Sequence, residues 1–274
     1  MPNFALRRTL LALSLAVCAA APAYAVEAEG GAAPAREPSI PGEFTFEGPL
    51  GTYDRAALQR GFQVYKEVCS VCHGLTRVAI RALGESGGPG FSEAEVRALA
   101  ASYMVPAGPN DRGETTDLDG NPLMREATTA DFLPPPYPNE KAARAAFNGA
   151  FPPDLSLIVK AREDNAHYLF RLLTGYDQQP PDGSAVPRGQ YYNPVFASGF
   201  IAMPQPLFDS QVTYADGTPA TIAQMAHDVT TFLAWAAEPK MEERKAMGFG
   251  VMVFLAGFAA LLYFSYRKVW RGQH

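Results

Sequence analysis

The chain has 274 residues, of which 47% are hydrophobic and 19% are charged, so it can bury a core as one large domain or two small ones. Its net charge is −5 at pH 7, which gives no indication of nucleic-acid binding and fits a basic protein partner better.

The first 25 residues are typical of an export signal. Arg7 and Arg8 supply a positive start, and the apolar run over residues 9–20 is too short to span a bilayer. Ala23-Tyr24-Ala25 matches the small-x-small cleavage pattern. We therefore expect a signal peptide over residues 1–25, and its removal leaves 21 basic and 28 acidic residues, a net charge of −7.

A loose leader and a first helix follow the signal. Residues 26–42 are rich in Ala, Gly, Pro and Glu and predict little fixed structure. Residues 54–68 predict a helix that Asp54 caps. Its apolar face is formed by Leu58, Phe62, Tyr65 and Val68, and the helix leads directly into Cys69.

The residues Cys69-Ser70-Val71-Cys72-His73 have the spacing for covalent haem attachment. One helical turn presents both sulfurs to one edge of the porphyrin, and His73 is then an axial ligand of the iron. A thioredoxin-like redox pair has no need of His73, and a zinc site needs further Cys or His residues at close spacing, which the sequence lacks. Cys69 and Cys72 are the only cysteines left after signal cleavage, so both are committed to this site.

The remaining exported residues predict short helices between long loops. A capping box, Ser92 to Glu95, opens one helix, and a second runs from Asn139 to Asn148. Residues 105–138 and 176–220 are rich in Pro and Gly and predict loops.

Apolar residues mark three further segments. Pro152-Pro153-Asp154 begins one that contains Leu155, Ile158 and Val159, and residues 166–174 predict another helix. Thr218-Pro219 predicts the start of the last helix before the C-terminal apolar run. One side of that helix is formed by Ile222, Met225, Val229, Phe232, Leu233 and Ala236, and Glu238-Pro239 ends it. The outline is mainly helical, rich in loops and almost without strands.

The uncharged run Met247 to Tyr266 is long enough to cross a membrane. Three basic residues follow it, at 267, 268 and 271, and three precede it, so charge alone does not orient the span. The export signal orients the span, because it places the residues between the signal and the span on the outer side of the membrane. We expect a haem domain over residues 26–245 on the outer side, a transmembrane helix over 246–267 and an inner tail over 268–274.

The second axial ligand is left open by the residues alone. Methionine and histidine candidates outside the span are Met104, Met124, Met203, Met225, Met241, His167, His227 and His274. Met203 stands in an irregular segment before Pro204 and Pro206, where a stiff backbone helps hold a weak thioether ligand. Met104 precedes Pro106 and is the alternative on the same reasoning.

Several stretches together resemble the cytochrome c1 family, the haem subunits of ubiquinol–cytochrome c reductase. The matching stretches are residues 60–65 (RGFQVY), 148–156 (NGAFPPDLS), 172–176 (LLTGY), 203–206 (MPQP), 216–221 (DGTPAT) and 235–239 (WAAEP). The motif at Cys69–His73 alone indicates only a c-type haem, whereas these stretches, in this order and before a C-terminal span, are specific to the family.

The resemblance implies a c-type cytochrome domain with long loop insertions and one covalently bound haem c. It implies attachment at Cys69 and Cys72 and iron ligation by His73 and Met203. It also assigns Arg162 to a haem propionate, which needs a cation of this kind. Haem-pocket walls are implied at Pro152, Pro153 and Tyr168.

The implied function is electron transfer in the bacterial inner membrane, with the haem domain in the periplasm. The chain would accept electrons from a Rieske iron–sulfur protein, assemble with cytochrome b and reduce a soluble c-type cytochrome. It would supply no catalytic acid, base or nucleophile. We expect acidic residues of the first long loop to steer a basic cytochrome, namely Glu114, Asp117, Asp119, Glu126 and Asp131. The alternatives are a stand-alone membrane-tethered electron shuttle and a thiol–disulfide oxidoreductase.

Overall fold

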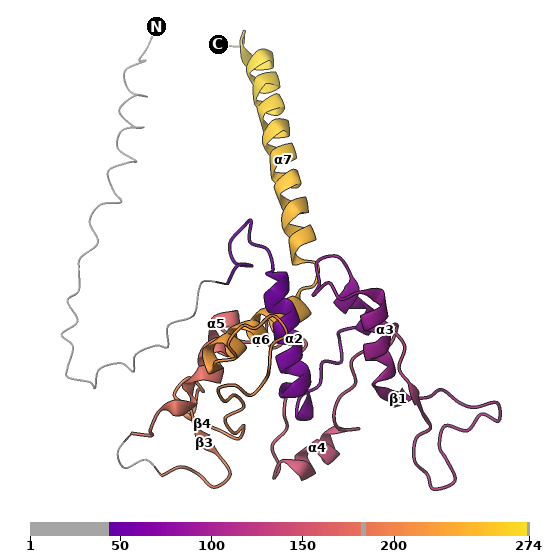
Figure 1. The fold of residues 1–274 in the computed structure, drawn as a ribbon. Coiled ribbons are helices and arrows are strands. Elements are labelled where there is room, and N and C mark those ends of the chain that lie inside the picture. Colours follow the sequence, from indigo (N-terminus) through magenta and orange to yellow (C-terminus); the bar gives the residue numbers. More distant parts are fainter. Residues whose placement is uncertain (1–43, 182–184, 273–274) are drawn as a thin grey trace. The chain divides into compact units, whose positions relative to one another are not determined.

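The computed structural model describes residues 44–181 and 185–272, so the predicted signal peptide and the predicted leader both lie outside the described residues. The helices are α2 (Arg55–Glu67), α3 (Glu93–Ala101), α4 (Glu140–Ala146), α5 (Asn165–Thr174), α6 (Ile222–Ala237) and α7 (Met241–Trp270), and the 3-10 helices are η1 (Cys69–Val71), η2 (Ile80–Gly84) and η3 (Gly175–Asp177). Short strands form two antiparallel pairs. The expected fold class, mainly helical with long loops and one C-terminal apolar helix, is confirmed (Figure 1).

Helices α2 and α6 pack against each other at the centre of the domain (Figure 1). Asp54 caps α2 as predicted, because its carboxylate accepts from the backbone N–H groups of Ala56 and Ala57. The two helices approach closely at Gly61, where a methyl group would overlap the carbonyl oxygen of Asp228 and lie 2.7 Å from Cβ of Phe232. A glycine at this point therefore permits the contact on which the core is built.

Helix α6 begins three residues later than the sequence predicts. Its cap is Thr221, whose hydroxyl accepts from the N–H of Gln224 at 3.1 Å. The N–H of Thr218 instead donates to Asp216, so the predicted Thr218-Pro219 start lies in a turn before the helix. The expectation of one apolar side was also incomplete, since residues 228–236 of α6 are buried on every side.

The shorter helices begin close to the residues that the sequence indicates. The capping box of Ser92 and Glu95 opens α3, and the amide oxygen of Asn139 caps α4. The apolar segment after Pro152-Pro153-Asp154 forms bends and turns over residues 155–164, and its Leu155, Ile158 and Val159 are buried.

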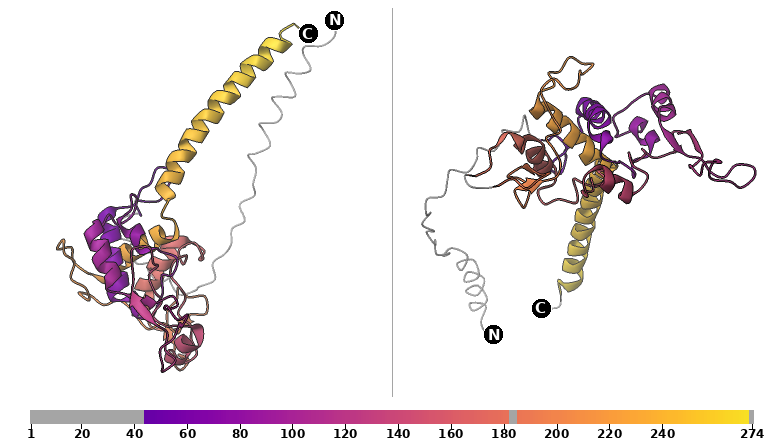
Figure 2. Two further views of the ribbon diagram at one scale, coloured as in Figure 1. Left: turned by 90° about the vertical axis from the view of Figure 1, so that its right-hand side faces the viewer. Right: turned by 90° about the horizontal axis from the view of Figure 1, so that it is seen from below.

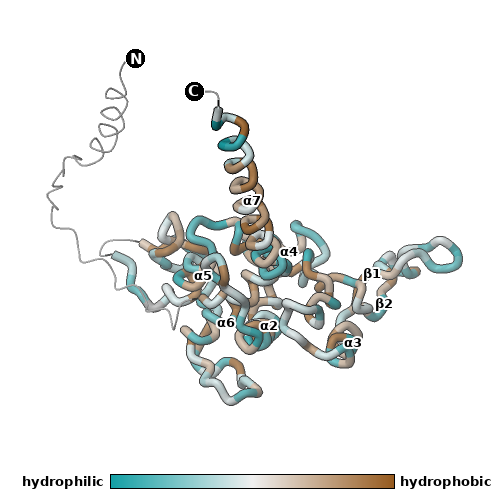
Figure 3. The backbone as a smooth tube through the Cα atoms, turned by 90° about the horizontal axis from the view of Figure 1, so that it is seen from above, coloured by the Kyte–Doolittle hydropathy of each residue, from teal (hydrophilic) through white to brown (hydrophobic). Residues whose placement is uncertain are grey.

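The two long loops each contain one strand pair. Strand β1 (Met104–Pro106) pairs with β2 (Met124–Glu126), and β3 (Tyr191–Tyr192) pairs with β4 (Phe200–Ile201). The segment between β1 and β2 is hydrophilic and extends away from α7 (Figures 1 and 3). These short ladders give the loops a fixed path that sequence periodicity did not indicate.

Helix α7 is the one helix among the described residues that is long and apolar enough to cross a membrane. It has 30 residues, a length of about 45 Å, and its central turns are hydrophobic (Figure 3). It is longer than the predicted span of 246–267. The charged residues Glu242 to Lys245, which lie before the predicted span, form its first turns, where Glu242 contacts Arg55 and Lys245 contacts Phe46.

Candidate haem site

The predicted attachment residues form a tight turn at the end of α2. Backbone N–H groups of Cys72 and His73 both donate to the carbonyl oxygen of Cys69, at 3.1 and 2.9 Å. Both cysteines are free thiols and half-buried. The turn holds two thiols and one imidazole close together, which is the donor set that a c-type haem requires.

The environment of the thiols opposes redox chemistry of their own. Burial raises the pKa of Cys69 to about 12 and also raises that of Cys72. The thiolate is the nucleophile in thiol–disulfide exchange, so reactive cysteines have lowered pKa values. Burial shifts the pKa values of Cys69 and Cys72 in the opposite direction, which disfavours the thiol–disulfide oxidoreductase.

The ring of His73 is oriented by one hydrogen bond. Its Nδ1 lies 2.7 Å from the carbonyl oxygen of Pro153, which can only accept, so Nδ1 carries the proton. Nε2 then has a free lone pair, as an iron ligand needs. Burial lowers the pKa of His73 and so favours the neutral ring. The protonation state and the backbone carbonyl therefore both fit a haem-iron ligand.

Residues 154–156 form hydrogen bonds with residues 74–77, directly after the Cys69–His73 turn. These bonds hold the turn against the segment that contains Pro153. The carboxylate of Asp154 accepts from both the N–H and the hydroxyl of Thr76, at 2.9 and 2.8 Å. Burial would raise the pKa of Asp154, but hydrogen bonds from Ser156 and Thr76 outweigh it and lower the pKa. The hydroxyl of Ser156 also accepts from the N–H of Arg77, and the N–H of Leu155 donates to Gly74.

Asp154 and Ser156 were not among the predicted site residues. They lie within the Pro-Pro-Asp-Leu-Ser stretch that carried the family resemblance. That resemblance was the sequence feature that could have pointed to them as site residues. Their partners lie nearly 80 positions earlier, so spacing within the sequence could not assign them a role.

The backbone of Met203 is held by a residue of η3, the 3-10 helix that follows α5. The hydroxyl of Tyr176 donates to the backbone carbonyl of Met203 at 3.0 Å, and the Met203 side chain is half-buried. Met104 lies on β1 with half of its surface exposed. The pairing of Met203 with His73 on one iron stays a prediction.

The other predicted pocket residues lie at different depths. Arg162 is exposed, and its guanidinium donates to the carbonyl of Ala161 at 2.9 Å. Among the described residues it has no carboxylate partner, which leaves it available for a propionate. Pro152 and Tyr168 are half-buried, and Pro153 is exposed. These assignments also stay predictions.

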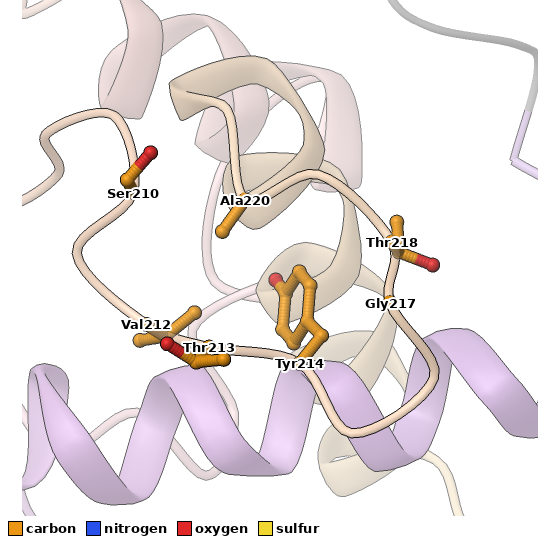
Figure 4. Close-up of a pocket in the computed structure, with 7 residues that line it drawn as sticks. All are labelled: Ser210, Val212, Thr213, Tyr214, Gly217, Thr218 and Ala220. Carbon is orange, nitrogen blue, oxygen red and sulfur yellow. The ribbon is translucent and has the colours of Figure 1, made fainter.

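A surface hollow of about 240 Å³ lies elsewhere, lined by residues 210–220 of the loop that precedes α6 (Figure 4). Its lining includes Ser210, Thr213, Tyr214 and Thr218. None of the predicted haem residues lines it, so the hollow is not the haem site.

Comparison with family models matches residues 44–273 to the cytochrome C1 family. The chain belongs to the cytochrome c1 family. The family carries haem c and acts in electron transport, which the donor set of the Cys69–His73 turn fits. The sequence resemblance is thereby confirmed.

Curated relatives support the same assignment. A protein of Kluyveromyces lactis named "Cytochrome c1, heme protein, mitochondrial" is 50% identical over 218 residues, covering 80% of this chain and 71% of the relative. The protein of that name in Saccharomyces cerevisiae is 48% identical over 229 residues, covering 84% and 71%. "Cytochrome b/c1" of Bradyrhizobium diazoefficiens is 49% identical over 250 residues, which cover 85% of this chain but only 35% of that longer protein.

Proposed function

We propose that the chain is the electron-transfer subunit of a ubiquinol–cytochrome c reductase. It accepts electrons from a Rieske iron–sulfur protein and reduces a soluble c-type cytochrome. The observation that carries this proposal is the turn at Cys69–His73, where the hydrogen bond from His73 Nδ1 to Pro153 leaves Nε2 for iron. Family membership supports the reductase as its setting.

One haem c would be held covalently by Cys69 and Cys72, and His73 and Met203 would bind its iron. When bound, its iron supplies one-electron redox chemistry, at a higher potential with His and Met than with two His ligands. Pro153 orients His73, and Tyr176 fixes the backbone of Met203. Placement and tuning are thus the contributions of the chain, which provides no acid, base or nucleophile.

Arg162 would pair with a haem propionate, and Pro152, Pro153 and Tyr168 would form walls of the pocket. The exposed guanidinium of Arg162 lacks a carboxylate partner among the described residues, which supports this use. A propionate bound there would receive charge-assisted hydrogen bonds.

Membrane placement follows from α7 and the predicted signal. We propose that α7 crosses the bacterial inner membrane, with the haem domain in the periplasm and the last residues in the cytoplasm. Cytochrome b is the proposed membrane partner, and the relative named "Cytochrome b/c1" supports this pairing.

Acidic residues between β1 and β2 would steer the soluble cytochrome. Glu114, Asp117 and Asp119 lie in the hydrophilic segment between the strands, Glu126 is the last residue of β2, and all four are exposed. Asp131 is different, because both of its carboxylate oxygens accept from the guanidinium of Arg125 at 2.7 Å. We therefore assign long-range attraction to the first four residues.

A freely moving shuttle is disfavoured by the junction with the membrane helix. Only residues 238–240 separate α6 from α7. Glu238 pairs with Lys160 at 2.7 Å and also with Arg244 in the first turns of α7. Helix α7 therefore begins from a side chain network of the haem domain and lacks a flexible linker.

Two measurements test the proposal. A denaturing gel stained for haem peroxidase activity should show a band at the mass of this chain, and its absence would refute covalent attachment. Detergent extraction of native membranes should yield the chain together with a cytochrome b and a Rieske protein. Purification of the chain alone, with quinol oxidation unchanged on its deletion, would favour the independent shuttle.

A further inference from the structure

Residues 47–51, Glu-Gly-Pro-Leu-Gly, form a loop beside the start of α7. We call it the Leu50 loop. The N–H of Glu47 donates to Phe44 and that of Thr52 donates to Thr45, both at 3.0 Å, so a closed turn presents the tip. Gly51 is required there, because a methyl group would overlap the carbonyl oxygen of Glu47. The Leu50 loop is thus a fixed turn.

The tip of this loop is uncharged and apolar on its outer side. Leu50 is 78% exposed, whereas its aromatic neighbours Phe44, Phe46 and Tyr53 are buried. The only charged residue of the loop, Glu47, accepts from His167 Nε2 at 2.8 Å, back on the domain. A single exposed leucine is ordinary on a protein surface and does not by itself indicate a binding surface. What the loop contacts therefore depends on where it lies.

Lys245 fixes that position relative to α7. Its ammonium donates to the carbonyl oxygens of Phe46 at 2.6 Å and Gly51 at 2.9 Å. The uncharged run of α7 starts at Ala246, which is about 1.5 Å further along the helix axis at the usual rise per residue. The views in Figures 1 and 2 agree that the loop lies beside the first turns of α7.

We propose that the Leu50 loop is a second membrane contact, with Leu50 inserted at the boundary between headgroups and acyl chains. The inference rests on α7 crossing the bilayer, which is part of the proposed function. The ligand is lipid, because the loop continues the apolar surface of α7 at the depth where its uncharged residues begin. A rigid, uncharged tip enters this boundary without burying a charge. Because the Leu50 loop lies to one side of α7, its contact with the membrane fixes the tilt of the haem domain relative to the bilayer.

Photocrosslinking in native membranes tests this contact. Leu50→p-benzoylphenylalanine would be expressed in the full chain within its complex, irradiated, and analysed by mass spectrometry for lipid adducts. The control is Leu118→p-benzoylphenylalanine, since Leu118 is fully exposed on the hydrophilic segment between β1 and β2, away from α7. We expect a lipid adduct from the Leu50 variant and none from the Leu118 variant.

The other outcomes overturn the inference. These are no lipid adduct at position 50, equal lipid labelling at both positions, or an adduct of the Leu50 variant with another polypeptide. Alkaline carbonate extraction of the same membranes separates this failure from that of the proposed span. A chain that stays in the membrane without labelling at position 50 refutes only the loop contact, whereas a chain that is extracted refutes the span as well.

Discussion

Replacing Gly61 by alanine tests the contact between α2 and α6. In an open helical position this change stabilises a protein by about 1 kcal/mol, because alanine has the higher helix propensity. At Gly61 the added methyl group would overlap the backbone of Asp228 and meet Cβ of Phe232. Backbone cannot move aside as a flexible side chain can, so we take the upper end of the cost of overpacking, about 3 kcal/mol.

The net expectation is a loss of about 2 kcal/mol in the free energy of unfolding. Guanidinium unfolding of the detergent-solubilised full chain, followed by circular dichroism, would measure it as a lower midpoint at unchanged slope. Gly250→Ala in α7 is the matched control, since a methyl group there meets nothing within 4 Å. A Gly61→Ala protein as stable as the parent, or more stable, would show that the helices do not approach as closely as described.

The remaining predictions concern the ligand, the junction with α7 and the acid stability of the core. Met203→Leu should lower the haem midpoint potential in a redox titration, whereas Met104→Leu should leave it unchanged; the reverse would make Met104 the ligand. Glu242→Gln should destabilise the chain by about 1 kcal/mol in thermal unfolding, because it weakens a half-exposed ion pair, while Glu243→Gln should have a smaller effect; equal effects would contradict the described contacts. Hydrogen bonds from His227, Arg60 and Gln224 outweigh burial and lower the pKa of Asp228, so its contribution to stability is present above about pH 4 and is lost as the pH falls through the lower folded-state pKa. Asp228→Asn should therefore reduce stability at pH 7 and flatten its dependence on pH below 4, and a parallel pH profile would refute the assignment.

Local signals in the sequence predicted the elements that depend on neighbouring residues. Asp54, Ser92 and Asn139 cap helices where expected, since a cap needs only a side-chain oxygen and the next few N–H groups. Thr218 is the exception. Thr221 lies three positions later with the same chemistry, and the turn at Asp216 occupies the N–H of Thr218, so propensity alone could not choose between two threonines.

The start of α7 shows the limit of composition. The predicted span began after the charged residues 242–245, yet these residues form the first helical turns of α7. Glu242 accepts from Arg55 and from the N–H of Tyr53, and Lys245 donates to two backbone carbonyls. These partners lie nearly 200 positions earlier in the chain, so no local pattern could have indicated them.

The sequence by itself determined the haem motif, the apolar span and the mainly helical class, because each depends on residue type and short spacing. Only the tertiary structure decided that the carbonyl of Pro153 orients His73 and that Tyr176 holds the backbone of Met203. The physical reason is that a hydrogen bond requires two atoms about 3 Å apart, and folding alone brings residues 73 and 153 to that distance.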